Sequence, residues 1–473
     1  MKEMPSENKA PVWIAGDKIN EVQFCKSFLE QYPMICINDT FFTVNGRVTD
    51  ENRLRKQILD WIKPYVTVGI PKKINNLLDT MRVMSYSEPL PAYTDRIHLA
   101  NGTYFLSGEF DPVKDFCINR LPVAYNPGAA TPTKWLAFLN QLLYPEDIAT
   151  LQEYMGYCLI PTTKGQQMLF LVGKGGEGKS RVGLVMRALL GDNMNTGSIQ
   201  KVEISPFARA DLEHLLVMVD DDMKLEALPQ TNHIKTIVTA ELPLDLERKG
   251  KQSYQGWLFS RFMVFGNGTM KSLYDRSEGF FRRQLILSVR DKDKHREDDP
   301  FLAEKLCSEA EGILLWALEG LRRLIAQNYH FTVSERTKAN RETAIKEGNN
   351  IVEFMESEGY FLFKADAQTT SKDFYAVYEL WCSDNSEKPM AAKSFSNFLA
   401  QHEKEYNLEH NNKVRKMNAE YTAEHYFAAL KLIEQLYKDG EIPAYMFRNI
   451  LKDYADVVDL SKFAIFEEKE DAA

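Results

Sequence analysis

One glycine-rich segment constrains the fold of this chain more than any other feature. Residues 173–180 read GKGGEGKS and stand between an apolar run of strand length, 168–172, and a helical run, 181–190. A glycine-rich turn from a strand into a helix is typical of phosphate-binding loops. Short apolar runs alternate with helical stretches around it, and this alternation predicts a parallel α/β core.

Each residue type in the segment suits phosphate chemistry. Glycines let successive N–H groups face one anion without a Cβ in the way. The lysine would reach the β- and γ-phosphates of ATP, and the hydroxyl after it would bind Mg²⁺. A chance glycine-rich loop is the alternative, and the flanking strand and helix argue against it. The predicted ATP ligands are Gly173, Gly175, Gly176, Gly178, Lys179 and Ser180.

Acidic residues follow a second apolar run. The segment 215–219 reads LLVMV, and Asp220 and Asp221 come directly after it. The carboxyl end of a parallel strand would bring both acids beside the phosphate loop. We expect Asp220 to bind Mg²⁺, directly or through water, and Asp221 to orient and deprotonate the attacking water. An ordinary acidic turn after a core strand is the alternative.

Two further polar positions complete the candidate site. Asn267 follows the apolar run 261–266, where a neutral amide can hold the lytic water without adding negative charge. Arg282 and Arg283 precede another predicted strand and suit stabilisation of transition-state charge, in this subunit's site or a neighbour's. An ordinary turn residue and an ordinary surface arginine pair are the alternatives.

These elements follow one another within 111 residues, counted inclusively from Gly173 to Arg283. Their order and compactness resemble the superfamily 3 helicases of the AAA+ class, and in particular the poxvirus-type helicase domain of phage and plasmid primase-helicases. The resemblance implies an AAA+ parallel-sheet ATPase core between an N-terminal α+β region and a C-terminal helical and winged-helix region. The stretches that carry it besides the loop are 101–112, 121–129, 151–161, 247–254, 275–283 and 311–321.

The resemblance also implies an activity. Such proteins form hexameric rings that use ATP to move along single-stranded DNA, typically 3′ to 5′, and unwind forked DNA when replication starts. A basic hairpin before the Asn strand lines their channel, which makes Lys249, Lys251 and Arg248 the DNA-binding candidates, with a solvated turn as the alternative. Net charge is −9, but residues 245–283 hold eight Lys/Arg against four Asp/Glu, a local +4. Binding through phosphates would weaken with salt.

Composition excludes several protein classes. Hydrophobic residues make up 44% and charged residues 26%, as in soluble folded proteins. We find no signal peptide and no apolar run long enough to span a membrane, so we expect a cytoplasmic protein without membrane contact. The six cysteines are scattered without a CxxC pair, which favours reduced thiols over disulfides or a structural metal.

Five parts are expected along the chain. Residues 1–84 form an α+β region, 85–162 a helicase-associated domain and 163–330 the ATPase core. A winged-helix-like domain, 331–417, contains a basic turn at 411–417 that either binds DNA or is simply solvated. A helical hairpin with an acidic tail, 418–473, ends the chain. Within these parts we expect hairpins turning at Asn45–Gly46 and Asn101–Gly102, and a long helix over 301–327.

Two features depart from the resembling family. Many relatives have a neutral residue where Glu177 stands, and many have Glu where Asp221 stands. We see no room for a priming domain before the resembling region, so a separate primase or replication initiator is the expected partner. The competing hypotheses are an ATP-dependent switch or loader that acts on a replication partner without unwinding DNA, and a regulatory protein with an inactive nucleotide site.

Overall fold

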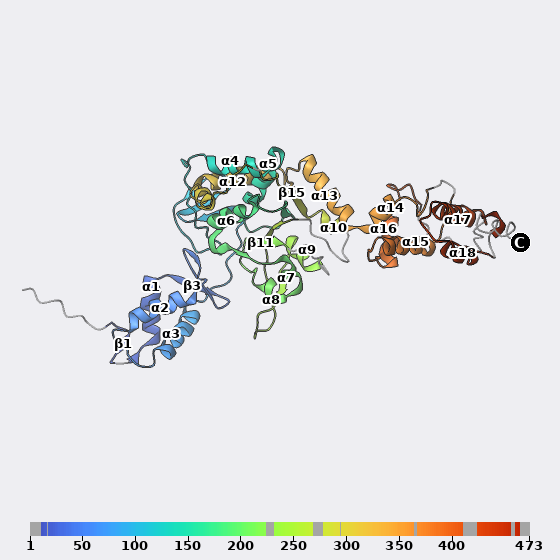
Figure 1. Ribbon diagram of the computed structural model, residues 1–473. Helices are drawn as coiled ribbons and strands as arrows, with labels where there is room; N and C mark the ends of the chain where they lie inside the picture. The colour runs from blue at the N-terminus through green and yellow to red at the C-terminus, as the bar shows by residue number, and fades with distance from the viewer. Residues whose placement is uncertain are drawn as a thin grey trace, which may run out of the picture. The chain divides into compact units, whose positions relative to one another are not determined.

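The chain divides into two compact units, Met1–Met390 and Ala391–Ala473 (Figure 1). The five-part division predicted above is finer than this and stays a prediction. None of the described helices is long and apolar enough to cross a membrane. The computed structural model describes residues 11–16, 18–223, 231–267, 278–293, 295–363, 367–409, 423–455 and 459–463.

A five-stranded sheet forms the centre of the first unit, and all of its strand pairs are parallel. The strands predicted at 168–172 and 261–266 are confirmed to the residue. The acidic strand begins two residues later than predicted and continues through its three aspartates. A mixed α/β fold with a parallel sheet is therefore present. In spatial order the strands are β10 (Met194–Thr196), β11 (Val217–Met223), β14 (Arg261–Gly266), β9 (Met168–Val172) and β15 (Gln284–Ser288).

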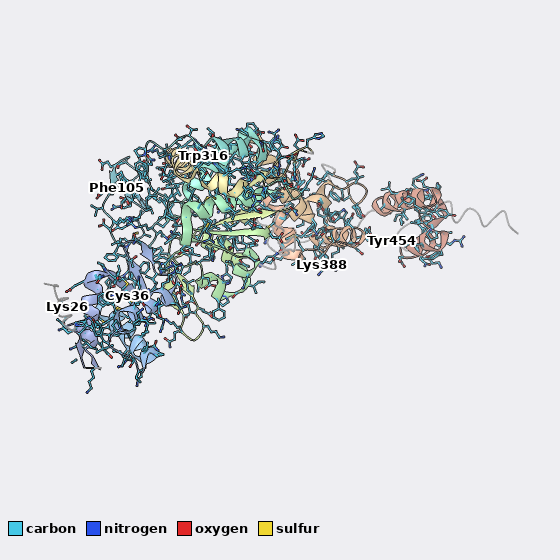
Figure 2. The ribbon with its side chains drawn as sticks, turned by 60° about the vertical axis from the view of Figure 1, so that its left-hand side comes forward. Lys26, Cys36, Phe105, Trp316, Lys388 and Tyr454 are labelled. Atoms are coloured by element: carbon cyan, nitrogen blue, oxygen red, sulfur yellow. The ribbon has the colours of Figure 1, made fainter. Side chains whose placement is uncertain are left out.

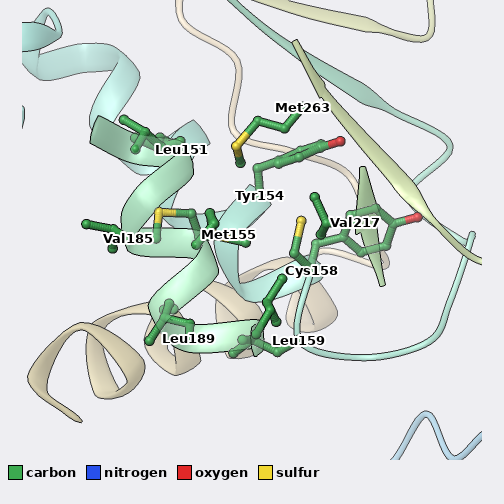
Figure 3. Packing of buried hydrophobic residues seen from close by; sticks show 14 of the residues in the cluster. Leu151, Tyr154, Met155, Cys158, Leu159, Val185, Leu189, Val217 and Met263 are labelled. Atoms are coloured by element: carbon green, nitrogen blue, oxygen red, sulfur yellow. The ribbon is translucent and has the colours of Figure 1, made fainter. Parts of the chain in front are cut away.

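Helices cover both faces of this sheet (Figure 1). Val217 and Val219 of β11 pack in the same cluster as helix α6, whereas Met218 packs with α7 and α9. Successive side chains of a strand point to opposite faces, which explains the division. Figure 3 shows α5 and α6 packing against β11 and β14. On the α6 side lie α4 (Thr133–Leu142), α5 (Pro145–Tyr157), α6 (Lys179–Leu190) and α12 (Ala310–Ala326), and on the other α7 (Ile199–Ile204), α8 (Pro206–Ala210) and α9 (Asn232–Val238).

Glycines bring α5 and α12 into close contact. A Cβ on Gly320 would lie 2.4 Å from the carbonyl oxygen of Gln152, and one on Gly156 would lie 2.4 Å from that of Ala317. Real Cβ atoms do not approach backbone so closely, so any side chain at either position would force the two helices apart.

We therefore expect Gly320→Ala to lower the free energy of unfolding of this unit by about 1–3 kcal/mol, the usual cost of overpacking. Urea denaturation followed by circular dichroism measures the loss. Gly128→Ala is the control, because the new Cβ would meet its nearest neighbour, Asn126, at 3.5 Å. Equal midpoints for the two variants would contradict close packing at this crossing.

The predicted helix over 301–327 is wrong in one respect, because it is interrupted. Helix α11 covers Leu302–Cys307, and α12 begins at Ala310. The carboxylate of Glu309, at the break, accepts hydrogen bonds from the backbone nitrogens of Lys134 and Trp135 at 3.2 and 3.0 Å. The break between α11 and α12 therefore contacts the start of α4. The periodicity of apolar residues along a helix does not predict such a contact.

Both predicted hairpins turn one residue earlier than expected. Thr43 pairs with Gly46, and Leu99 pairs with Gly102, so each glycine begins the returning strand instead of completing the turn. At Gly102 the reason is a close approach, since a Cβ there would lie 2.1 Å from the carbonyl oxygen of Asp111 in the next strand. The strands are β3 (Met34–Ile37), β4 (Thr40–Thr43), β5 (Gly46–Arg47), β6 (Arg96–Leu99), β7 (Gly102–Phe105) and β8 (Phe110–Asp111).

Three helices cover the first of these small sheets. Asp50 caps the second of these helices, α2, and accepts a hydrogen bond from the nitrogen of Asn52 at 3.0 Å. Cys36 is buried in this region (Figure 2), and all six cysteines are free thiols, as predicted. Burial raises the pKa of the Cys25 thiol to about 12. The elements are β1 (Ile14–Ala15), β2 (Lys18–Ile19), α1 (Glu21–Gln31), α2 (Glu51–Ile62) and α3 (Ile70–Met84).

The last part of the chain is helical, as predicted. In the second unit, Gly440 adopts a φ of +79° between α17 and α18, which forms the expected helical hairpin around buried Phe447 and Leu451. The basic turn predicted at 411–417 lies outside the described residues. The helices are α13 (Glu335–Gly348), α14 (Asn350–Glu356) and α15 (Ser371–Asp384) in the first unit, and α16 (Ala392–Gln401), α17 (Ala423–Lys438) and α18 (Ala444–Lys452) in the second.

Candidate nucleotide-binding site

The predicted phosphate loop connects β9 to α6. Its first residue donates a hydrogen bond from the nitrogen of Gly173 to the carbonyl oxygen of Gly266 at 3.1 Å, which joins the loop to β14. Gly175, Gly176 and Gly178 adopt φ angles of +111°, +81° and +111°, a region that side chains disfavour. No side chain caps the start of α6. Three positions of the loop therefore have backbone conformations that favour glycine.

A carboxylate lies inside this loop. One oxygen of Glu177 accepts hydrogen bonds from the backbone nitrogens of Lys174 and Gly175 at 2.5 and 2.8 Å. The other accepts from the Nζ of Lys179 at 2.8 Å, and the Glu177 side chain is only 3% exposed. Burial raises the pKa of Glu177, but the bonds from Lys179 and the backbone outweigh it and hold the pKa below its usual value.

The segment that follows β15 forms hydrogen bonds and an ion pair with the phosphate loop. The guanidinium of Arg296 donates to the carbonyl oxygens of Glu177 and Gly176 at 3.0 and 3.1 Å. Asp291 pairs with Lys174 at 2.8 Å, and both of these side chains are largely exposed. This charged connection therefore contacts the candidate site directly.

The two aspartates with predicted roles differ in burial. Asp220 is 5% exposed, and its carboxylate accepts a hydrogen bond from the nitrogen of Ile199, at the start of α7, at 2.8 Å. Burial raises the pKa of Asp220. Asp221 is exposed.

The pairing of β11 with β14 shifts its register next to these residues. Asp220 pairs with Val264 and Met223 pairs with Gly266, so Asp221 and Asp222 together oppose one residue of β14. Such a bulge re-aims side chains at the end of a strand. Both carboxylates are exposed, at the edge of the sheet that also carries the phosphate loop.

Asn267 lies against the phosphate loop, as its position after β14 predicts. A Cβ on Gly175 would lie 3.9 Å from each of the two terminal atoms of the Asn267 amide. Strand β14 stands between β9 and β11 in the sheet, so Asn267 emerges between the loop and the aspartates. Asn267 is exposed.

Arg282 and Arg283 lie at the opposite edge of the sheet. Gln284 follows them and pairs with Met168, the first residue of β9, whereas the phosphate loop follows the last. The length of β9, five residues at about 3.3 Å each, separates the two places by roughly 16 Å. The arginines line a cavity of about 350 Å³ together with Lys164, His330 and Arg341.

The basic hairpin exists, with strands β12 (Leu244–Leu246) and β13 (Tyr254–Gly256). Its charges are partly paired: Arg248 bonds to Glu213 at 2.8 Å, and Lys251 bonds to Asp39 of the N-terminal region at 2.9 Å. Lys249 forms no ion pair with any residue in the parts of the chain that the structure describes.

Comparisons with known proteins find one matching family and several similar solved structures. Residues 171–283 match a family described as a family of unknown function, DUF5906. No curated protein matches the chain. Two solved structures of the NrS-1 C-terminal region are similar, each at 13% identity: one has a TM-score of 0.49 and covers 86% of this chain and 98% of that chain, and the other has a TM-score of 0.48 and covers 83% and 96%.

The matched segment begins within β9 and ends at Arg283, so it contains every residue to which we assign ATP, metal or DNA binding. The fold brings Lys179, Asn267 and Asp221 to one edge of the sheet and leaves Asp220 buried and the arginines at the far edge. Their roles stay predictions.

Sequence reasoning missed the contacts of two residues. The carboxylate of Glu177 accepts hydrogen bonds from the backbone of its own loop, and the guanidinium of Arg296 donates to a carbonyl oxygen of that loop. The available signal was a carboxylate among the glycines of an anion-binding segment.

Proposed function

We propose that this chain is an ATP-dependent DNA helicase of the superfamily 3, AAA+ type that acts in replication as a hexameric ring. The observation that carries the proposal is the phosphate loop between β9 and α6, with Lys179 inside it and the Asn267 amide beside it. A strand-to-helix glycine loop with an amide and carboxylates at the same sheet edge provides the parts that hydrolysis of a nucleoside triphosphate requires.

The residues at this edge fit a magnesium–ATP complex. Backbone nitrogens of the loop and the Lys179 ammonium would hold the phosphates, and the Ser180 hydroxyl would bind the metal ion. Asp221, which is exposed, would orient the attacking water together with Asn267. Asp220, which already accepts a backbone hydrogen bond, would act on the metal only through water. Bound Mg²⁺ would neutralise charge on the phosphates.

The position of the arginine pair supports a ring. Arg282 and Arg283 stand roughly 16 Å from the phosphate loop of their own chain, given about 3.3 Å per strand residue, which exceeds the reach of an arginine side chain. An arginine that stabilises transition-state charge can come from a neighbouring subunit. In the proposed hexamer, each pair would serve the site of the next copy.

The test is ATP hydrolysis and unwinding of forked DNA by the purified protein. Single-stranded DNA is expected to stimulate hydrolysis at low salt and to lose this effect as salt rises, because the contacts are with phosphates. Reversing Lys249 and Lys251 together to glutamate should lower unwinding at least about tenfold through lost phosphate contacts. The matched control reverses Lys26 and Lys72, exposed lysines on α1 and α3. Unchanged unwinding in the hairpin variant would exclude this hairpin as the DNA contact.

One observation favours the second candidate, a switch or loader that acts on a replication partner. Lys251 is already paired with Asp39 and Arg248 with Glu213, so these two charges of the hairpin are engaged within the chain. A hairpin used for internal contacts would not need DNA. Hydrolysis that is indifferent to DNA, with no unwinding, would support this function instead.

A further inference from the structure

We propose that Glu177 is an internal competitor for the phosphate site, so that a nucleotide binds only by expelling its carboxylate from the loop. The inference rests on the proposed function to the extent that the loop binds a nucleotide. It adds to that function a residue that sets the affinity of the site and the class of ligand that can enter.

The contacts of Glu177 are those of a bound anion. Its carboxylate accepts from two successive backbone nitrogens, those of Lys174 and Gly175, and from the ammonium of Lys179. Successive N–H groups in a glycine-rich turn form an anion-binding concavity, and a carboxylate oxygen satisfies them as a phosphate oxygen does. The Glu177 side chain is 3% exposed, so it occupies this concavity fully.

One set of donors cannot serve two anions. A phosphate oxygen bound to the nitrogens of Lys174 and Gly175 would take the place that the carboxylate holds, and two anions side by side would repel each other. The glycines on either side, Gly176 and Gly178, have positive φ angles and no side chains, which leaves the backbone around Glu177 free to turn. Arg296 holds the carbonyl oxygens of Gly176 and Glu177, so it stabilises the occupied form.

The competition selects for polyphosphates. A single inorganic phosphate offers the loop little more than the carboxylate already provides. A nucleoside di- or triphosphate adds a second phosphate group that can reach the uncapped start of α6 as well. We therefore expect ADP and ATP to enter the wild-type site and inorganic phosphate to be excluded.

The experiment measures ADP binding in the presence of Mg²⁺ by isothermal titration calorimetry on the full chain. Glu177→Gln, which keeps the shape and removes the charge, should bind ADP about tenfold more tightly, because the apparent affinity rises as the competent fraction of the site increases. Glu177→Ala should bind at least as tightly and should also gain binding of inorganic phosphate. Circular dichroism checks that each variant is folded.

Asp291→Asn is the matched control. It removes one negative charge next to the same loop by breaking an exposed pair with Lys174, and it leaves the concavity unchanged. Its affinity for ADP should stay within about twofold of the wild type, as for surface pairs. If both Glu177 variants bind ADP no more tightly than Asp291→Asn, the competition is excluded. If no protein binds ADP at all, the proposed function fails instead.

Discussion

Replacing Lys179 by alanine should reduce ATP hydrolysis by at least about 100-fold, in line with the loss of a preorganised group that stabilises transition-state charge. Lys179 is 8% exposed, and its ammonium lies inside the loop at 2.8 Å from the internal carboxylate, so the side chain already occupies the place from which it would contact phosphate. A steady-state assay of phosphate release at saturating ATP measures the effect.

Lys174→Ala is the control, because it belongs to the same loop but points outward to Asp291 and contributes only its backbone nitrogen to the concavity. That variant should keep most of its activity. Normal hydrolysis after loss of Lys179 would mean that the loop does not bind ATP, and it would remove the basis of the proposed function.

Replacing Arg283 by alanine should lower hydrolysis by about 1,000-fold while leaving nucleotide binding intact, the usual result for an arginine supplied by a neighbouring subunit. The length of β9 separates Arg283 from the loop of its own chain, so we expect its effect to pass between copies of the chain. Arg282→Ala, assayed in parallel, determines which of the two arginines carries the effect.

Mixing two inactive variants tests this geometry directly. A ring containing both Lys179→Ala and Arg283→Ala subunits has interfaces where an intact loop meets an intact arginine, and these interfaces should recover part of the hydrolysis. A control ring that contains only Lys179→Ala subunits should stay inactive. Failure to recover activity, with both variants assembled, would contradict action across subunits.

The sequence predicts well those elements whose signals are local. The runs at 168–172 and 261–266 become strands with the predicted bounds because both are apolar, short and surrounded by helices. Pro145 begins α5, as its fixed φ favours. The bounds of the acidic strand and of the two turns differ from the predicted bounds by one to four residues. Pairing with a neighbouring strand determines where a strand begins and ends, and no local sequence pattern predicts that pairing.

The interior of the candidate site was less predictable. Glycine spacing identifies an anion-binding loop but does not say which anion lies there, and the side chain of Glu177 reaches it only because the loop folds back on itself. Likewise, Asp220 and Asp221 are adjacent in sequence, yet Asp220 is buried and accepts a hydrogen bond from the start of α7, whereas Asp221 is exposed to solvent. Partners such as these depend on tertiary structure.

Strand β15 lies between Arg283 and Arg296 in the sequence. Arg283 directly precedes the first residue of β15. Arg296 follows its last residue by eight positions and donates a hydrogen bond to a carbonyl oxygen of the phosphate loop. All five residues of β15 are paired with β9, so the register between the two strands is fixed along the whole length of β15. Arg283 and Arg296 are therefore anchored to opposite ends of the strand that lies directly beside the strand leading into the phosphate loop.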